Sequence, residues 1–278
     1  MSSQTPIPPS SPRKTPLFNR GVRVKSMKIA RLIIAAVLTA SSLLPATATA
    51  GQRRFAFTYE ATTAAKGSLE MENWVTWQAR RGSGSNSNEF DFRHELELGL
   101  TEHLELGLYL SDWSITRSGG HTETVWSNVA AEFIYNLTNP TTDTLGSALY
   151  LETQLGDELF ALEAKLLLQK NIGPWLLAYN AALEARWESS GYREQNGEFQ
   201  QTLGISYQIN PRFTIGAELL NEMDFVDWGT ASNRTLYIGP NASVRFGRAF
   251  ATATVLFQAT DIEDEPKVQS RLIFGIQF

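Results

Sequence analysis

The chain ends in Leu272-Ile273-Phe274-Gly275-Ile276-Gln277-Phe278, a stretch in which large apolar residues occupy every second position. A period of two is the pattern of a β-strand with one apolar face. The same alternation recurs backward through the chain to about Gly67, with charged and polar residues in the opposite phase. The pattern predicts an all-β fold built from strands with one apolar and one polar face.

Twelve such runs can be counted between turn-forming residues. Their expected ranges are 67–79, 89–100, 103–113, 124–137, 145–155, 158–170, 174–188, 197–209, 212–223, 235–246, 249–259 and 267–278. Most connections alternate between short turns (near 101–102, 171–173, 210–211 and 247–248) and longer polar loops (near 80–88, 114–123, 189–196, 224–234 and 260–266). Two break the rule, because 138–144 is long on the short side and 156–157 is short on the long side. An even strand count and this asymmetry predict a twelve-stranded antiparallel transmembrane β-barrel, wound as an up-and-down meander.

The start of the chain has the pattern of a secretory signal peptide. A basic stretch beginning at Met27 precedes the apolar run 32–38 and a small-residue stretch at 46–50. We therefore expect residues 1–50 to be an upstream extension and signal, with translation starting at Met27 and cleavage after Ala48 or Ala50. Residues 67–278 form the predicted barrel.

Residues 51–66 need a separate interpretation. Phe55, Phe57 and Tyr59 alternate there, but a thirteenth strand would spoil the even count. We expect this N-terminal segment to lie in the lumen or in the periplasm.

Composition excludes several classes of function. Seven of the 24 basic residues lie within residues 1–50, which leaves 17 basic against 29 acidic residues in the mature chain. This negative balance disfavours nucleic-acid binding. The absence of cysteine excludes disulfides, thiolate metal sites and a cysteine nucleophile. No apolar run after residue 50 reaches the length of a spanning helix, so the chain spans as a barrel or not at all.

Aromatic residues support the barrel over a soluble β-sandwich, which is the alternative for these strands. One predicted group lies near the short turns: Tyr135, Trp175, Tyr207, Phe213, Phe246, Phe250 and Phe278. A second lies near the long loops: Trp77, Phe90, Phe160, Trp187, Phe199 and Phe257. Two belts at opposite strand ends are typical of the two interfaces of a bilayer. Three residues do not fit this pattern. The polar residues His94 and Asn73 occupy outward positions of otherwise apolar strands, and Pro240 lies inside a strand, where it removes a hydrogen-bond donor.

The inward phase is polar and mostly acidic, and it supplies the candidate lumen residues. They are Glu70, Glu72, Asp91, Arg93, Glu95, Glu97, Glu105, Tyr109, Glu132, Glu152, Glu163, Lys165, Arg186, Glu218, Arg245 and Arg271. One interpretation is a narrow channel or solute-binding transporter that prefers cations. The other is a closed structural or surface-interaction barrel whose lumen is filled by ion pairs. The sequence names neither the solute nor the oligomeric state.

Catalysis has little support in the sequence. A serine nucleophile needs a base within hydrogen-bonding reach. The three histidines, His94, His103 and His121, fall on the outer face, in a turn and in a loop. Acids expected near the outer rim could form a protease site, but loop acids are usually only solvated. We expect no enzymatic activity, no metal site and no cofactor; an outer-membrane hydrolase is the weaker alternative.

Two features resemble known protein families. The terminal aromatic Phe278, with Phe274 in the same phase, resembles the assembly signal that ends bacterial outer-membrane barrels. A second resemblance lies near the start of the predicted mature chain, in Tyr59-Glu60-Ala61, Lys66-Gly67, Glu70 and Trp74. These residues resemble the YEA…KG…E…W opening of an uncharacterised bacterial outer-membrane family. They more distantly resemble the opening of phenol-pathway-type outer-membrane transporters, although Ala65 replaces the proline that is usual there. The resemblance implies the outer membrane of a Gram-negative bacterium. It implies lipid, lipopolysaccharide and the barrel-assembly machinery as partners, and transport of small solutes.

Overall fold

The computed structural model describes residues 53–82, 86–231, 234–263 and 265–278. All described residues lie within one compact unit, Leu44–Phe278. The expected signal peptide and its cleavage site lie outside the described residues. Where the structure describes the chain, no helix is long and apolar enough to cross a membrane.

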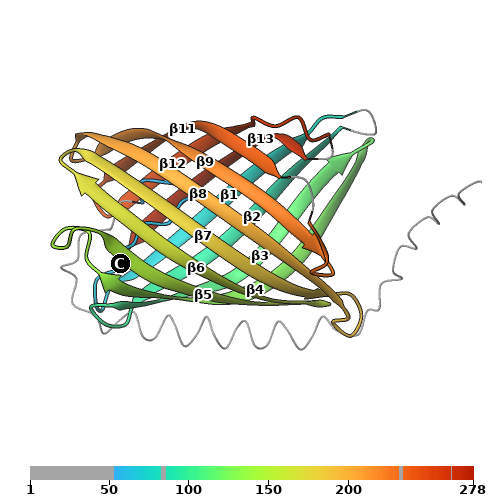
Figure 1. The fold of residues 1–278 in the computed structure, drawn as a ribbon, viewed down its shortest axis with the longest axis horizontal. Coiled ribbons are helices and arrows are strands. Elements are labelled where there is room, and N and C mark those ends of the chain that lie inside the picture. The colour runs from blue at the N-terminus through green and yellow to red at the C-terminus, as the bar shows by residue number, and fades with distance from the viewer. Residues whose placement is uncertain (1–52, 83–85, 232–233, 264) are drawn as a thin grey trace, which may run out of the picture. The chain divides into compact units, whose positions relative to one another are not determined.

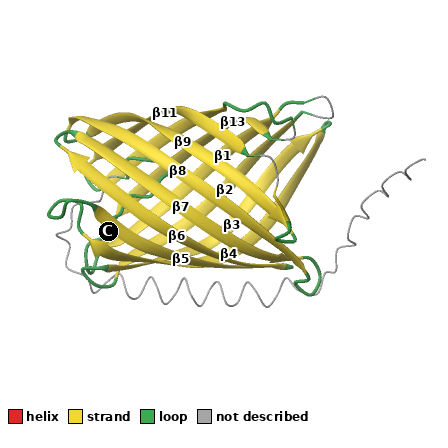
Figure 2. Cartoon of the chain, in the orientation of Figure 1, coloured by secondary structure: helices red, strands yellow, loops and turns green. Residues whose placement is uncertain are grey.

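Twelve long strands and one short strand make up the fold (Figures 1 and 2). The long strands are β1 (Leu69–Arg80), β2 (Ser87–Gly99), β3 (Leu104–Ser118), β4 (His121–Thr138), β5 (Gly146–Gly156), β6 (Leu159–Ile172), β7 (Trp175–Glu188), β8 (Glu194–Asn210), β9 (Phe213–Val226), β11 (Thr235–Phe246), β12 (Ala249–Gln258) and β13 (Pro266–Gln277). The short strand β10 (Thr230–Ala231) pairs only with the end of β9.

The twelve long strands close on themselves. Each long strand pairs antiparallel with its neighbours in the chain, and β1 pairs with β13 from Glu70–Gln277 to Arg80–Pro266. The backbone amide of Phe278 adds one more bond, to the carbonyl of Leu69 (2.9 Å). The predicted twelve-stranded up-and-down barrel is confirmed.

The two faces of the wall differ in chemistry. Large apolar side chains such as Leu149, Leu151 and Phe257 are about half exposed on the outside. The inward phase of the wall carries buried polar groups such as Glu132 on β4 and Glu152 on β5. A continuous apolar outer surface of this extent suits the hydrocarbon of a bilayer.

The two ends of the barrel differ in their connections. We define the turn end as the end with residues 100–103, 139–145, 173–174, 211–212 and 247–248, where residue 278 also lies. The described residues of the loop end are 81–82, 86, 119–120, 157–158, 189–193, 227–231, 234, 259–263 and 265.

The connection expected at 114–123 is not a long loop. β3 continues to Ser118 and β4 begins at His121, so only Gly119 and Gly120 form the turn. Both glycines have positive φ (57° and 81°), which a two-residue hairpin turn with the twist of its strands requires. The polar residues of 114–123 suggested a loop, but strands that project beyond an apolar band can be polar on both faces.

The outward polar residues Asn73 and His94 satisfy each other. They are cross-strand partners on β1 and β2, and the His94 Nδ1 and Asn73 Oδ1 atoms lie 2.8 Å apart. The indole of Trp113 donates to His94 Nε2 (3.3 Å). Asn73 and His94 can therefore form hydrogen bonds on the outer face of the wall.

Two other residues differ from what the strand pattern predicts. Pro240 has no amide hydrogen to donate, and at Gly239 and Pro240 the strand β11 has no paired residues on β12. Phe250 was expected in the aromatic belt near the turns, but this prediction was wrong: its side chain is fully buried. The ring fills the space above Gly275, where any Cβ would collide with it.

Candidate functional site: an occupied lumen

The barrel interior is occupied by the chain's own residues 53–66, which we call the lumenal segment. Phe55, Ala56, Phe57, Thr58 and Tyr59 are each 8% exposed or less. None of residues 53–66 belongs to a strand, so no ladder satisfies their backbone polar groups. A buried backbone needs other partners, and side chains of the barrel supply them.

Glu218 of β9 binds the most deeply buried part of the segment. Its carboxylate accepts hydrogen bonds from the backbone amides of Ala56 (2.9 Å), Phe57 (2.9 Å) and Thr58 (2.7 Å). The hydroxyl of Thr254 donates to the same carboxylate (2.6 Å). Hydrogen bonds to a charged acceptor contribute about 1.5–3 kcal/mol each, so Glu218 is a main anchor of the segment.

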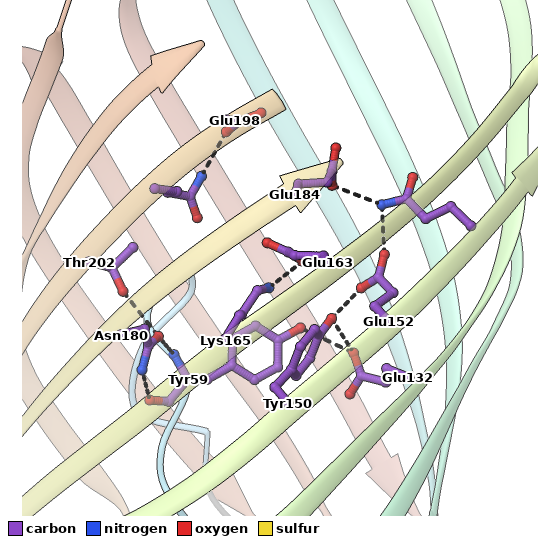
Figure 3. Close-up of polar contacts among 12 residues, drawn as sticks. Tyr59, Glu132, Tyr150, Glu152, Glu163, Lys165, Asn180, Glu184, Glu198 and Thr202 are labelled. Carbon is purple, nitrogen blue, oxygen red and sulfur yellow. Dashed lines mark hydrogen bonds and ion pairs between the residues drawn. The ribbon is translucent and has the colours of Figure 1, made fainter. Parts of the chain in front are cut away.

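Amide side chains bind the returning half of the segment. Asn180 accepts from the Tyr59 amide (2.7 Å) and donates to the Tyr59 carbonyl (3.0 Å). Ala61 is bound in the same way by two residues, because its amide donates to Gln169 (2.9 Å) and its carbonyl accepts from Asn136 (2.6 Å). Figure 3 shows Tyr59 against Asn180 on one side and against Lys165 and Tyr150 on the other.

The first residues of the segment are fixed near the turn end. The hydroxyls of Ser243 and Thr252 both donate to the Arg53 carbonyl. The Arg53 guanidinium pairs with Glu72 (2.9 Å) and Glu97 (3.3 Å) and lies over the rings of Tyr59 (4.4 Å) and Trp74 (4.6 Å). A buried guanidinium is favourable here because carboxylates and aromatic faces surround it.

Phe55 fills a pocket in the wall. It forms a buried cluster with Leu176 and Ala178 of β7. Its ring lies where a Cβ of Gly204 would be, 2.6 Å from the ideal position. Glycine at position 204 is therefore required by the close approach of the segment to β8.

Carboxylates and tyrosines form a second buried cluster beside the segment. The hydroxyls of Tyr109 and Tyr150 (2.9 Å for Tyr150) donate to Glu132, and Tyr59 reaches the same oxygen at 3.4 Å. The same Tyr150 hydroxyl also contacts Glu152, so its one hydrogen is shared between the two carboxylates. Figure 3 shows Tyr150 between the two carboxylates. These contacts connect the tip of the segment to β3, β4 and β5.

The lumenal segment leaves two separate cavities. The outer cavity, toward the loop end, has a volume of about 710 Å³, and Phe57 and Tyr59 form part of its floor. The inner cavity, toward the turn end, has a volume of about 270 Å³ and is lined by residues 60 and 62–65 of the segment. Tyr59 lines both, so the segment lies between them.

Ion pairs line the outer cavity. Lys165 pairs with Glu163 (2.9 Å), and Arg93 pairs with Asp112 (2.9 Å). Arg186 pairs with Glu184 and Glu198. These pairs come from β2, β3, β6, β7 and β8, and Figure 3 shows the pair of Lys165 with Glu163.

The candidate residues chosen from the sequence fall into four places. Asp91, Arg93, Glu152, Glu163, Lys165, Arg186 and Arg271 line the outer cavity. Glu70, Glu72, Glu97 and Glu105 line the inner cavity. Glu95, Tyr109, Glu132 and Glu218 are buried and line neither cavity. Arg245 lies near the turn end of β11, outside the lining of both cavities.

Several residues of the site were not identified from the sequence. Arg53 and Phe55 lie in the segment whose place was left open, and Asn136 was not noted. The signal that could have found the occupied lumen is a set of apolar residues in the inward phase. Ile134, Leu167, Leu220, Leu256 and Ile273 are fully or nearly buried, and they form one hydrophobic cluster with Ala56, Phe57 and Tyr59. Inward apolar residues require an apolar partner inside the barrel.

The inner cavity contains one arrangement that could ligate a cation. Among the described residues, Glu70, Glu72 and Glu97 bring carboxylate oxygens within 4.8 Å of one another. The Arg53 guanidinium bonds to two of these three side chains. The positive charge that such a cluster requires is thus supplied by the segment.

The histidines are separated from one another and from both cavities. His94 lies on the outer face with Asn73, His103 lies in a turn, and His121 begins β4 beside the Gly119–Gly120 turn. Asp112 is bound by the Arg93 guanidinium inside the lumen. No histidine lines either cavity, so the lumen offers no histidine base to a nucleophile.

Solved structures share this fold at low sequence identity. The COG4313 outer membrane channel from Pseudomonas putida F1 is 15% identical, with a TM-score of 0.57 over 78% of this chain and 98% of that chain. The translocator domain of the autotransporter NalP from Neisseria meningitidis is 12% identical, with a TM-score of 0.51 over 91% of this chain and 98% of that chain. No curated protein matches the sequence significantly. Residues 47–265 match a protein family whose description is "Family of unknown function (DUF6662)", and because this match covers most of the chain, the chain belongs to that family.

Proposed function

We propose that this chain is an outer-membrane channel for small cationic solutes, and that the lumenal segment closes it in the structure described here. The apolar outer wall and the fold shared with an outer-membrane channel support the membrane location. The single observation that carries the proposal is the excess of acidic side chains on both sides of the segment.

Acidic side chains outnumber basic ones by four in each cavity. The outer cavity is lined by nine acidic and five basic side chains. The inner cavity is lined by five acidic side chains and by one basic side chain, Arg53, which belongs to the segment itself. Rings of carboxylates attract cations and repel anions in narrow aqueous pores. Glu60 and Arg53 both belong to the segment, so when the segment leaves, the inner cavity keeps four carboxylates and no basic side chain, and it still prefers cations.

The segment is held by contacts that can be broken. Its partners are hydrogen bonds, ion pairs and the Phe55 pocket, and no covalent link other than the backbone at residue 66 joins it to the barrel. We infer that the closed lumen and an open lumen are two states of one protein. The same deep burial also favours a second candidate, a barrel that stays closed and acts only through its surface.

The location and partners follow from the same proposal. The chain is exported through its signal peptide to the outer membrane of a Gram-negative bacterium, and the barrel-assembly machinery inserts it there. Lipid contacts the apolar wall, and lipopolysaccharide contacts the loop end. No enzymatic step, nucleic acid or cofactor is part of this proposal.

The test is the reversal potential in a planar bilayer under a KCl gradient, measured on an open form of the barrel. We expect the potential to show a preference for potassium. The double variant E70Q/E97Q removes two carboxylates of the inner cavity and should reduce the cation-to-anion permeability ratio severalfold. The matched control E102Q changes an exposed turn residue outside the lumen and should leave the ratio unchanged. Anion preference of the open barrel would overturn the proposal.

A further inference from the structure

The contacts between the barrel and the lumenal segment are of a particular kind. Most of the hydrogen bonds that the wall makes to residues 53–64 go to backbone amides and carbonyls, as for Glu218, Asn180 and Gln169. Arg271 adds a bond to the Ala56 carbonyl (3.1 Å), and Asn241 adds one to the Arg54 carbonyl (2.6 Å). Recognition of an extended backbone, with pockets for a few side chains, is how proteins bind peptides.

Two pockets add selectivity for side chains. Glu72 and Glu97 take an arginine, and Leu176, Ala178 and Gly204 take a phenylalanine two residues later. The bound sequence therefore has a cationic residue and an aromatic residue in the spacing of Arg53 and Phe55. Each side chain matches its pocket, because the pocket of the cationic residue is acidic and the pocket of the aromatic residue is apolar.

The barrel wall does not depend on the segment for its own closure. The pairing of β1 with β13 begins at Glu70, and the backbone bonds that join residues 67 and 68 to the wall, such as Gly67 to the Gly99 carbonyl (2.7 Å), lie after the segment's buried part. The stretch between Thr62 and Lys66 is exposed or half-buried, so it can be reached from the turn end. The segment is thus a ligand held by a short accessible tether.

We propose that the lumen is a binding site for an extended polypeptide, and that the lumenal segment is a tethered occupant that a separate peptide can replace. The ligand class is a cationic peptide with an arginine two residues before an aromatic residue. The tether gives its own segment an effective concentration on the order of millimolar. A free peptide competes only when that tether is cut or when its affinity is higher.

The experiment cuts the tether in the folded protein. A site-specific protease sequence replaces residues 62–65, the full chain is folded in detergent micelles, and the barrel is cleaved and washed. A fluorescent peptide of residues 51–66 is then added, and its binding is followed by anisotropy. We expect saturable binding of one peptide per barrel, with no binding of a scrambled peptide of the same composition.

Variants on both sides test the contacts. The barrel variant E218Q presents an amide hydrogen to backbone donors, and it should weaken binding at least tenfold. Peptides with Arg53→Ala or Phe55→Ala should also bind at least tenfold more weakly. The control F257A removes a similar ring from the outer wall and should leave affinity unchanged.

The parent barrel could instead retain the cleaved segment through the wash while E218Q loses it. That result would also support a peptide-binding lumen. Equal binding of the native and scrambled peptides would overturn the proposal. No binding to a barrel that has lost the cleaved segment and keeps its heat-modifiable mobility would overturn it as well. Because binding is measured without ion flow, a failure here is distinct from a failure of the proposed cation channel.

Discussion

At the scale of single residues, Phe55 and Gly204 determine how tightly the lumen is closed. The ring occupies the space that any side chain at position 204 would need. Removing a buried phenylalanine costs about 3 kcal/mol, which changes a two-state ratio by roughly two orders of magnitude. We predict that F55A raises the open fraction of single-channel records by that order. F257A serves as the control, and equal open fractions in F55A and the parent would show that the pocket does not hold the lumen closed.

Phe278 acts at the other end of the chain. Its amide closes the last bond to Leu69 (2.9 Å), and its ring is exposed on the outside at the turn end. Deleting Phe278 should reduce membrane insertion, since both the bond and an interfacial aromatic are lost. The fraction of heat-modifiable protein in outer-membrane preparations measures this effect. Full insertion of the shortened chain would remove Phe278 from the assembly signal.

Only some of the side-chain contacts in the lumen could be predicted from the sequence. The inward phase predicts that Glu132, Glu152 and Lys165 point into the barrel, because a period of two depends only on neighbours in the chain, and the three side chains make their contacts there. The partner of Arg53 could not be found in this way. Which carboxylates meet it depends on how residues 53–66 return into the barrel, and that path is set by contacts such as Ala56 to Glu218, 162 positions apart.

At the scale of elements, strand positions were predicted to within a few residues. The run expected at 174–188 is observed as Trp175–Glu188, and that expected at 235–246 as Thr235–Phe246. The largest difference is the β3–β4 hairpin, whose polar strands extend beyond the apolar band to Gly119 and Gly120. Strand ends there are decided by turn geometry and not by burial, so apolar alternation alone could not locate them.

Processing is a prediction for the N-terminal element. The small residues at 46–50 place the first residue of the mature protein at Thr49 or Gly51. The mature chain would then begin within four residues of Arg53, the first described residue of the lumenal segment. N-terminal sequencing of protein from outer membranes tests this. A mature chain that still contains residues 32–44 would contradict the signal-peptide interpretation.

At the scale of the whole molecule, the charge of the lumen predicts how selectivity depends on salt. The screening length is about 10 Å at 0.1 M salt and about 3 Å at 1 M. Carboxylates lining a cavity of about 710 Å³ therefore influence passing ions strongly only at low salt. The cation-to-anion permeability ratio of the open barrel should fall toward that of bulk solution between 0.1 and 1 M KCl. A ratio independent of salt would mean that pore width, and not charge, selects the ions.

Closure of the lumen by the chain's own residues is the central claim, and one bilayer measurement tests it directly. Single-channel conductance is compared between the parent protein and a variant lacking residues 53–65, with both confirmed as heat-modifiable barrels. The parent should be closed for most of the time, because Phe55 through Tyr59 separate the two cavities. The shortened barrel should conduct steadily and prefer cations. An inserted barrel that lacks the segment and still passes no current would contradict the account and identify the protein as a closed structural barrel.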